Sequence, residues 1–583
     1  MTTIQRLVKT GSGNGIPDNL YYRDCKNVDL CEKIYFNKKS NLCLHSYFNT
    51  FSLSFWKSRV NYKSIALELK AKGDFVLNVI LKREDGTIAS ILSKRLDKNI
   101  DYHRFEGVFS SLGSIDTNEV ASIILKSETG GYVEECNWIT TDNPQKVKVG
   151  IIITHFNRIE WVIPAVERLK KEILKDEYFG DKAELVIVDN SCNIGVESSE
   201  KITVLPLNNM GCSGGFARGM KYLIENEGFT HGLFMDDDAT CEAESIKRLI
   251  NIFQYSKINN EAVAGALFCE PEFSKLWECG ASWTTTWNPN HHGIKPTGIN
   301  ILKITNNTKK TTYGGWWFFG FKLHDNLKWP FPFFLRGDDV TFSISNNFKV
   351  ITPLGIACWG DSFALKDSPY LKYLDARLHT ITPVVFSTTS VLNLLKTFKN
   401  LTVSLIGCYR YDSAAAFLQG VRDSLSNEIF WIENFSIKKI RSRITKNIQS
   451  ELYTPHGNLV VKDWRNKKFK ETLFRKILRK GTLGGLLIPR FLMSTDIREF
   501  RKDWGIGNKY VFPCSKIMFT NDVNGSSWIA SKNTFRAIAI YIELVYTQTL
   551  ILSAWIFKKK HYINIYNSLT TKESWDKIFK VYE

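Results

Sequence analysis

Apolar and polar residues alternate along much of the segment from residue 20 to residue 138. The alternation is most regular in ALELKAKGDFVLNVILKREDGTIASILSKRL, where Gly73-Asp74 and Asp85-Gly86 occupy turn-like positions. A period of two residues is typical of strands that bury one face, and the two interruptions predict hairpin turns. We therefore expect a β-rich domain over residues 1–145, closed most simply as a β-sandwich and ending in the linker Asn143-Pro144-Gln145.

The pattern changes at Lys146, where short continuous apolar runs begin to alternate with helical stretches. VKVGIIITHF, ELVIVDN, ITVLPL and GLFMDDD are typical of buried strands. Helices are expected from about Glu160 to Lys175, after the glycine-rich NNMGCSGG, and over EAESIKRLINIF. This order predicts a doubly wound, Rossmann-like α/β domain over residues 146–385. Ligands of such folds gather at the carboxyl ends of strands, where Asn190, Asn209 and Asp236-Asp237-Asp238 are expected.

Residues 386–583 are mostly helical in pattern and basic. The whole chain has a formal charge of +18, and the part from Val385 onward, with 32 Lys and Arg against 15 Asp and Glu, contributes +17. The basic stretch 462–480 has interleaved aromatic and aliphatic residues, as in helices that lie on an anionic membrane. A solvated basic face is the alternative. The apolar segment 537–557 contains Glu543, so we expect a buried or interfacial helix rather than a membrane span.

Composition narrows the class of protein. A chain of 583 residues exceeds one compact core, and 44% hydrophobic residues exclude wholesale disorder. The twelve cysteines are scattered, without CxxC spacing, which argues against structural zinc and fits a reducing compartment. The first residues, MTTIQRLVKTGSGNG, lack the apolar run of a signal peptide, so we expect a cytoplasmic location. Nucleic-acid binding is not expected, because basic charge is its only support.

Three adjacent carboxylates, Asp236, Asp237 and Asp238, follow one of the expected buried strands. They repel one another unless a cation compensates them, and Mg²⁺ or Mn²⁺ prefers such oxygen ligands. Side chains two residues apart on a strand point the same way, so Asp236 and Asp238 can reach one metal ion. The alternative is an acidic loop or the N-cap of the helix that follows.

Two later motifs carry candidate chemistry. In GGWWFFG, residues 314–320, paired tryptophans beside glycines can form a platform for the face of a sugar, although aromatic runs more often belong to the core. In Arg336-Gly337-Asp338-Asp339, one carboxylate crowded by another can serve as a general base. An exposed loop pair or a helix N-cap is the alternative.

These motifs resemble, in order, those of bacterial galactofuranosyltransferases of glycosyltransferase family 2, of the mycobacterial galactan polymerase type. The resemblance rests on VGIIITHFNR, ELVIVDNS, NNMGCSGGFARGM, FMDDDA, GGWWFFGF, PFFLRGDDVTFSI and PLGIACWGDSF, with SYFNTFSLSFW nearer the N-terminus. It covers about residues 20 to 380 well and the C-terminus loosely. It implies a GT-A catalytic domain between an N-terminal β-sandwich and a C-terminal helical domain. It also implies inverting, Mn²⁺- or Mg²⁺-dependent transfer from UDP-galactofuranose to a cell-surface glycan, such as a lipid-linked galactan or O-antigen.

The resemblance also implies roles for single residues. Those matched to the nucleotide are Arg158, Asn190, Asn209, Gly211, Asp236 and Asp237. Those matched to the metal are Asp236 and Asp238. Those matched to the acceptor are Trp316 and Trp317, with Trp359 as a further substrate contact. Asp339 matches the catalytic base, with Asp338 beside it.

One position departs from the family pattern. In the relatives a histidine that follows a tryptophan completes the metal shell, whereas here Trp359 is followed by Gly360, which has no side chain. Asp361 is the nearest replacement, and a water ligand or a weakened metal site are the alternatives. His291 and His292 are too distant in sequence to be assigned.

The resemblance further implies a peripheral position at the inner face of the cell membrane and a possible homo-oligomer. Two other functions stay open at this point. The chain could transfer another sugar from a UDP donor, or it could be a degenerate, non-catalytic glycan-binding homologue whose metal site failed at Gly360.

Overall fold

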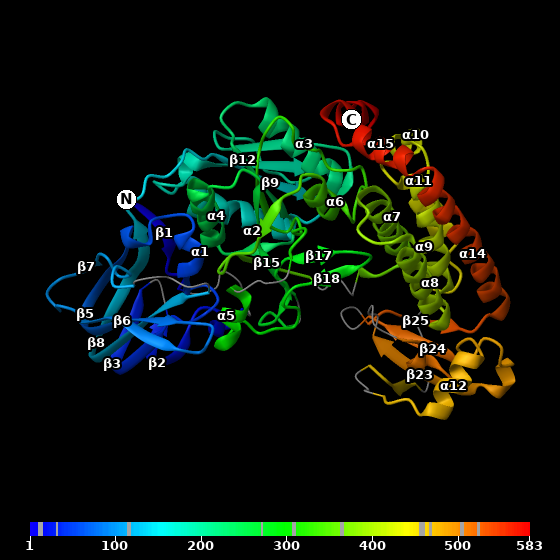
Figure 1. Cartoon of the computed structure of the whole chain (residues 1–583), viewed down its shortest axis with the longest axis horizontal. Helices are drawn as coiled ribbons and strands as arrows, with labels where there is room; N and C mark the ends of the chain where they lie inside the picture. Colours follow the sequence, from blue (N-terminus) through cyan, green and yellow to red (C-terminus); the bar gives the residue numbers. More distant parts are fainter. Residues whose placement is uncertain are drawn as a thin grey trace.

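The computed structural model describes residues 1–9, 16–30, 33–112, 118–269, 272–305, 310–361, 366–453, 461–465, 469–501, 507–521 and 525–582. Figure 1 shows an elongated molecule in which an N-terminal sheet, a central α/β region and a largely helical C-terminal region follow one another.

The N-terminal region is β-rich, as the alternation predicts. Its described strands form one hydrogen-bonded, antiparallel network, because β5 and β8 are long and pair with each other along most of their length. The expected closure as a β-sandwich stays a prediction. The strands are β1 (Thr2–Arg6), β2 (Arg23–Leu30), β3 (Ile34–Cys43), β4 (Phe51–Ser52), β5 (Ile65–Lys82), β6 (Ile88–Arg95), β7 (Tyr102–Phe105) and β8 (Val120–Thr140). Short helices are η1 (Asp18–Leu20), α1 (Leu53–Lys57) and η2 (Tyr62–Ser64).

The predicted turn at Gly73-Asp74 is wrong, whereas a turn at Asp85-Gly86 does join β5 to β6. Strand β5 continues through Gly73, which has a φ of 135° and lies opposite Gly131 of β8. A Cβ at Gly73 would lie 2.6 Å from the carbonyl oxygen of Gly130. Glycine therefore serves here to let two bulged strands approach each other closely.

The central region is built on a mixed sheet in the order β11-β10-β9-β12-β19-β14-β20. The expected strands are present and parallel as β9 (Val149–His155), β10 (Ala183–Asp189), β11 (Ile202–Pro206) and β12 (His231–Asp236). Strand β19 (Phe319–Lys322) is antiparallel to both of its neighbours, β12 and β14 (Glu261–Ala264), and β20 (Lys349–Ile351) completes the sheet.

Helices cover both faces of this sheet. Ile151 and Ile153 of β9 join the core that contains Val162 and Val166 of α2 (Ile159–Leu169), while Ile152 joins the core of α3 (Gly211–Glu225) on the other face. Side chains that alternate along a strand produce this two-sided burial. The remaining helices of the region are η3 (Lys170–Leu174), η4 (Gly180–Lys182), α4 (Ala243–Tyr255), α5 (Ile299–Thr305) and α6 (Asp338–Ser345).

A smaller sheet in the order β13-β21-β15-β16 lies next to the carboxyl end of β12. Its strands are β13 (Thr240–Cys241), β15 (Ala266–Cys269), β16 (Leu276–Glu278) and β21 (Ala357–Gly360). A hairpin of β17 (Ala281–Trp283) and β18 (Trp287–Pro289) follows β16.

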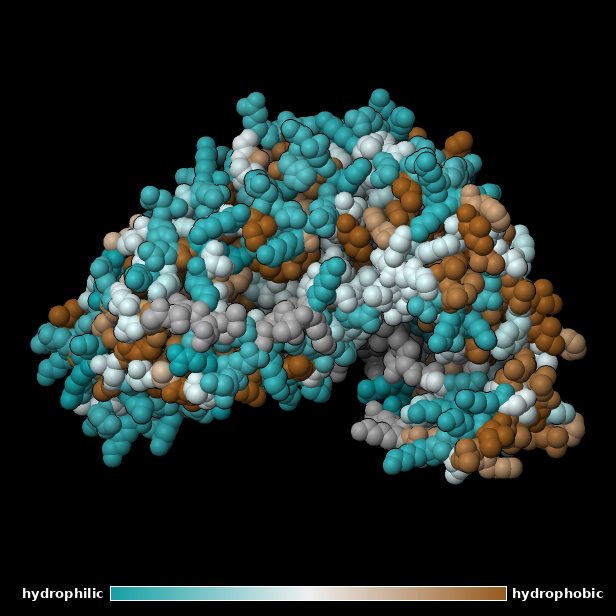
Figure 2. All heavy atoms as spheres, viewed as in Figure 1, coloured by the Kyte–Doolittle hydropathy of each residue, from teal (hydrophilic) through white to brown (hydrophobic). Residues whose placement is uncertain are grey.

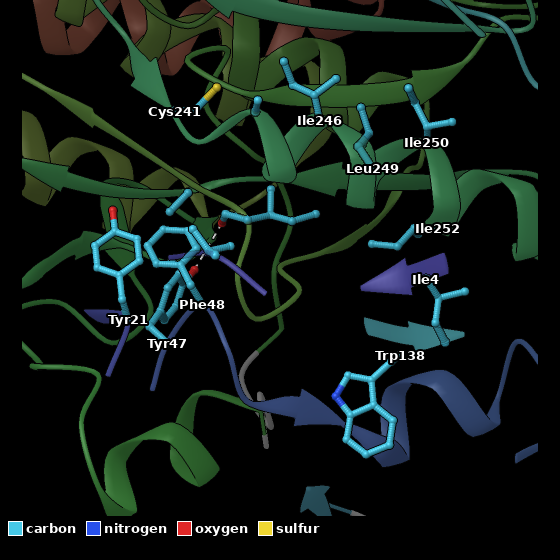
Figure 3. Packing of buried hydrophobic residues seen from close by; sticks show 14 of the residues in the cluster. Ile4, Tyr21, Tyr47, Phe48, Trp138, Cys241, Ile246, Leu249, Ile250 and Ile252 are labelled. Carbon is cyan, nitrogen blue, oxygen red and sulfur yellow. Dashed lines mark hydrogen bonds between the residues drawn. The ribbon is translucent and has the colours of Figure 1, made fainter. Parts of the chain in front are cut away.

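The N-terminal sheet and the central region share one hydrophobic core. Figure 3 shows Ile4 of the N-terminal region near Ile252 of α4, and Tyr47 and Phe48 of the N-terminal region belong to the same buried cluster as Cys241. A buried arginine, Arg248 of α4, reinforces this junction with hydrogen bonds to main-chain carbonyls of both regions. The two regions therefore pack as one body.

The C-terminal region is helical, but it also contains a four-stranded sheet that helical patterning did not predict. Its strands pair in the order β22-β23-β24-β25. They are β22 (Lys462–Asp463), β23 (Ser494–Arg501), β24 (Cys514–Thr520) and β25 (Ser527–Ser531). The helices are α7 (Pro369–Phe386), α8 (Val391–Gly407), α9 (Tyr411–Ser424), α10 (Glu428–Glu433), α11 (Lys438–Lys446), α12 (Leu473–Gly481), η6 (Arg490–Leu492), α13 (Asn508–Val511), α14 (Thr534–Phe557), α15 (Lys559–Leu569) and α16 (Lys572–Tyr582).

The end of the chain returns to the central region. Trp575 of α16 is fully buried, and its ring nitrogen donates to the carbonyl oxygen of Pro330 at 2.8 Å. Asn208 donates to the carbonyl oxygen of Tyr582 at 2.8 Å. Helix α16 therefore packs on the central region, although it lies far from that region in sequence. The last helix of the chain thus contacts a domain other than the one that its place in the sequence predicts.

Candidate functional site

A cavity of about 860 Å³ lies at the carboxyl ends of β9, β10 and β12, where the doubly wound fold predicts a ligand. Every residue to which the resemblance gave a role lines it, except Trp359 and Asp361. These lining residues are Arg158, Asn190, Asn209, Gly211, Asp236, Asp237, Asp238, Trp316, Trp317, Asp338 and Asp339. Residues up to 181 positions apart in the chain thus meet in one cavity.

Asn190 and Asn209 hold the glycine-rich loop at one end of the cavity. The side-chain oxygen of Asn190 accepts from the amide of Met210 at 3.2 Å, and that of Asn209 accepts from the amide of Gly211 at 3.1 Å. Free amides at the first turn of a helix attract anionic groups such as phosphates. The loop is thereby fixed at the start of α3, beside the cavity.

Gly211 is required by a close approach of two loops. Its φ of 65° lies in the left-handed region, and a Cβ there would stand 2.3 Å from the carbonyl oxygen of Phe334. The same carbonyl accepts from the amide of Ser213 at 3.2 Å. The glycine-rich loop is therefore joined to the segment that leads into Asp338 and Asp339.

The three adjacent carboxylates lie at the end of β12 and just beyond it. Strand β12 ends at Asp236, and the N-cap of α4 is Glu242, so the triad does not cap that helix. One oxygen of Asp237 accepts from the amide of Phe156 at 3.0 Å. Burial, followed by the charges of Asp238 and Asp237, raises the pKa of Asp236 well above its ordinary value.

Asp238 and Asp361 converge on the same two cations. Arg158 lies 3.6 Å from each carboxylate, and Lys366 lies 3.2 Å from Asp238 and 3.6 Å from Asp361. In the described part of the chain, no group of three or more His, Cys, Asp or Glu side chains gathers as a metal-binding set. Asp238 and Asp361 nevertheless pair with positive charge here. The side chains of Arg158 and Lys366 offset the repulsion between the carboxylates, as a bound cation would.

Asp338 and Asp339 form the first turn of α6. The loop before them contains Phe334, Arg336 and Gly337, all with φ in the left-handed region. Such strained backbone is frequent at functional sites. Asp338 is buried and accepts from the Ser213 hydroxyl at 2.8 Å, so it is not an exposed loop residue.

The two carboxyl groups differ in acidity. Burial raises the pKa of Asp338 to about 6, against the lowering effect of the Ser213 hydrogen bond. Burial and then the charge of Asp338 raise the pKa of Asp339 to about 8. A carboxyl with a pKa near neutrality can both accept and release a proton under cellular conditions.

The paired tryptophans have different surroundings. Trp316 is only 3% exposed and packs edge-on against Phe216 and Phe234, so most of its ring belongs to the core. Trp317 is partly buried, and its ring nitrogen donates to the carbonyl oxygen of Gly265 at 3.0 Å. A Cβ at Gly315 would lie 2.3 Å from that ring, so the glycine lets the indole lie against the backbone.

Trp359 lies in the core rather than on the cavity wall. It is 4% exposed and stacks between Phe48 and Phe268, with ring centres 5.7 and 5.8 Å away. This position gives no support to a sugar contact. His291 and His292 do not line the cavity either, and His292 instead bonds the carbonyl oxygen of Trp277 at 2.8 Å.

Sequence patterns missed a buried glutamate that lines the cavity. Glu278, at the end of β16, is 1% exposed and accepts from the ring nitrogen of Trp287 at 2.6 Å. Burial raises its pKa to about 7, and its charge contributes to the raised pKa values of Tyr313 and Asp339. The only local signal was the WECGASW segment itself, in which one acid stands among apolar residues.

The chain is similar to two curated galactofuranosyltransferases named GlfT2. It is 23% identical over 465 residues to that of Mycobacterium tuberculosis, covering 72% of this chain and 70% of the relative. It is 20% identical over 416 residues to that of Mycolicibacterium smegmatis, covering 67% of this chain and 64% of the relative. No family model matches the chain.

Among solved structures, the crystal structure of GalNAc-T7 with UDP, GalNAc and Mn²⁺ overlaps 45% of this chain and 55% of that chain. The TM-score is 0.29 at 11% identity, and so small an overlap carries no argument. The names of the two sequence relatives agree with the function that the motifs lining the cavity predict. The chain is therefore a glycosyltransferase similar to the mycobacterial galactofuranosyltransferases, which confirms the resemblance that its motifs predicted.

Proposed function

We propose that this glycosyltransferase transfers galactofuranose from UDP-galactofuranose to a hydroxyl group of a glycan acceptor, with inversion at the anomeric carbon. One observation carries the proposal: the carboxylates expected at the donor diphosphate and the Asp338-Asp339 pair line the same cavity. The names of both sequence relatives support galactofuranose as the sugar. The acceptor we propose is a lipid-linked galactan or an O-antigen type of glycan.

Asp339 is the proposed general base. It lines the cavity, and its Oδ1 accepts from the amide of Val340 at 2.8 Å, while the structure gives its other oxygen no described partner. That oxygen takes the proton of the acceptor hydroxyl as the hydroxyl oxygen attacks the anomeric carbon, and UDP departs. Asp338 keeps Asp339 basic through its negative charge and is itself held by Ser213.

The nucleotide is expected at the glycine-rich end. Arg158 and Asn190 are proposed to contact the uridine, and Asn209 positions the amides of the loop for the phosphates. Asp237, fixed by the amide of Phe156, is proposed to meet the ribose.

Asp236, Asp238 and Asp361 would hold a divalent ion. The fit rests on Asp238 and Asp361, which converge on Arg158 and Lys366, and on the half-buried carboxyl of Asp236, whose pKa is raised by desolvation and by the charges of Asp238 and Asp237. Oxygen ligands suit Mn²⁺ and Mg²⁺. Such an ion, when bound, offsets the negative charge of the departing diphosphate.

The test supplies the protein with UDP-galactofuranose, Mn²⁺ and a short galactose-terminated acceptor, and follows product by mass spectrometry and linkage analysis. Parallel reactions contain UDP-galactopyranose or UDP-glucose, and a further one contains a chelator. We expect product from UDP-galactofuranose and none after chelation.

If product formed from UDP-galactopyranose or UDP-glucose but not from UDP-galactofuranose, the proposed donor would be wrong. Binding of UDP without product from any donor would instead favour the non-catalytic, glycan-binding alternative, in which Gly360 reflects a lost metal ligand. Undiminished transfer after chelation would refute the metal site.

A further inference from the structure

Lys366 is a cation of the cavity wall to which the proposed reaction gives no role of its own. Its ammonium nitrogen lies 3.2 Å from a carboxylate oxygen of Asp238 and 3.6 Å from one of Asp361. Its charge also lowers the pKa of Asp236, against the raising effects of burial and of the neighbouring carboxylates. Lys366 therefore acts on all three of the carboxylates that are proposed to hold a divalent ion.

Arg158 is the second cation at these carboxylates, 3.6 Å from Asp238 and from Asp361. Its charge lowers the pKa of Asp237, the carboxyl proposed to meet the ribose, and Arg158 itself is proposed to contact the uridine. The nucleotide thus gives Arg158 a partner. A divalent ion among the carboxylates, by contrast, would place a like charge beside the Lys366 ammonium, which repels it.

The main chain at Lys366 is held in place by the next residue, Asp367. The buried Asp367 carboxylate pairs with Arg410 at 2.6 Å and with Lys372 at 2.8 Å, and Glu451 holds Arg410 from its other side at 3.2 Å. The Lys366 side chain is 39% exposed, and its four-carbon stem is flexible. The ammonium can therefore leave the carboxylates without any movement of the main chain at Asp367.

We propose that the Lys366 ammonium takes the place of the divalent ion in the nucleotide-free protein and turns to the diphosphate when the ion and UDP bind together. In the free protein the ammonium offsets the repulsion among the carboxylates. In the complex the ion takes over that function, and the phosphate oxygens offer the displaced ammonium a charge-assisted hydrogen bond. Lys366 would then stabilise the charge of the departing UDP.

This exchange couples the ion to the nucleotide. Without UDP, a divalent ion must displace the Lys366 ammonium into solvent, whereas with UDP the ammonium gains a new anionic partner. Mn²⁺ and UDP should therefore each strengthen the binding of the other. The inference rests on the proposed metal site and on a UDP donor, but not on the identity of the sugar or of the acceptor.

The test measures binding rather than transfer, with the variant Lys366→Met in the full-length protein. Methionine keeps an unbranched apolar stem but removes the charge. Mn²⁺ alone, titrated by electron paramagnetic resonance, should bind the variant roughly five- to tenfold more tightly, because the competing ammonium is gone. UDP, titrated by calorimetry at saturating Mn²⁺, should bind roughly tenfold more weakly, because a charge-assisted phosphate contact is lost.

Two further variants separate the charge from its position. Lys366→Arg returns a positive charge and should bind Mn²⁺ alone like the wild-type protein. Lys438→Met removes a charge from another lysine of the cavity wall, for which the structure describes no ion pair with the three carboxylates. It should also leave the binding of Mn²⁺ alone unchanged. Cooperative thermal unfolding of each variant establishes that it is folded.

Unchanged or weaker binding of Mn²⁺ alone by Lys366→Met would overturn the exchange, and so would an undiminished affinity for UDP. If Mn²⁺ bound neither the wild-type protein nor the variant, with or without UDP, the exchange and the metal site would both be wrong. Failure of the proposed function is seen separately. A protein that binds Mn²⁺ and UDP as expected here, but transfers no galactofuranose, would keep the exchange and lose only the proposed reaction.

Discussion

Asp338 and Asp339 are neighbours in sequence, but they differ in burial, in hydrogen-bond partners and in pKa. Asp338 is 4% exposed and accepts from Ser213, whereas Asp339 is more accessible and faces the cavity. Burial and the adjacent charge raise the pKa of Asp339 to about 8, above the value of about 6 for Asp338. At neutral pH the pair therefore shares a proton that lies mainly on Asp339.

Transfer should consequently rise with pH. Below an apparent pKa near 8 the Asp339 carboxyl is protonated and cannot accept the hydroxyl proton, so kcat/KM is expected to fall from pH 9 to pH 6.

Asp339→Asn should lower transfer roughly 10²- to 10⁴-fold at every pH while UDP affinity, measured by calorimetry, stays the same. Asp375→Asn, another carboxylate on the cavity wall, should keep the wild-type profile. A wild-type rate in Asp339→Asn would remove it as the base.

At the scale of elements, the start of α3 links the two halves of the site. Gly211 turns the chain into the helix with a left-handed φ while the loop at Phe334 passes against it. Asn209 and Asn190 hold the amides on either side. Displacement of this turn would move both the glycine-rich loop and the segment that carries Asp338.

Gly211→Ala should therefore destabilise the protein more than a comparable change elsewhere. Gly195→Ala is the matched control, because Gly195 has nearly the same φ, 66°, but open space where a Cβ would lie. Both variants suffer about 1 kcal/mol of backbone strain, and Gly211→Ala adds about 1–3 kcal/mol of overpacking. Thermal unfolding followed by circular dichroism should show the larger drop in midpoint for Gly211→Ala. Equal drops would mean that the contact with Phe334 relaxes freely.

At the scale of the whole molecule, Arg248 ties the N-terminal sheet to the central region. Its guanidinium donates to the carbonyl oxygens of Phe48 and Arg6 at 2.8 and 3.0 Å, and it pairs with Glu244 at 3.2 Å. The side chain is 3% exposed. A buried charge with such partners is costly to remove, because they are left unsatisfied.

Arg248→Met should lower stability on the order of 3–5 kcal/mol and release the N-terminal region to proteolysis. The readouts are the thermal midpoint and the rate of limited trypsin cleavage. Arg95→Met, which removes an exposed pair with Asp74 at 2.8 Å, should leave both unchanged. If Arg248→Met also left them unchanged, the two regions would be held by their shared apolar core alone.

Some residues of the candidate site could be predicted from local sequence patterns, and others could not. Asp236 follows a run of apolar residues, and Asp339 stands in a short motif, so both were found from local signals. Lys366 has no such signal, and Glu278 has only its place among the apolar residues of WECGASW. Both residues line the cavity because of neighbours that only the fold brings together. Trp359 shows the converse: its motif resembles a substrate contact, but packing between Phe48 and Phe268 places it in the core.

The sequence by itself determined the order of strands and helices in the α/β domain, and with it the strand ends that bear Asn190 and Asp236. It could do so because side-chain periodicity and backbone preference act over a few residues. Only the tertiary structure decided that Gly73 lies within a strand, that α16 returns to the central region, and that α12 turns its apolar side outward (Figure 2). These features depend on which distant segments pack together. The hydrophobic periodicity of a segment shows that one of its faces is buried, but it does not show which other segment covers that face.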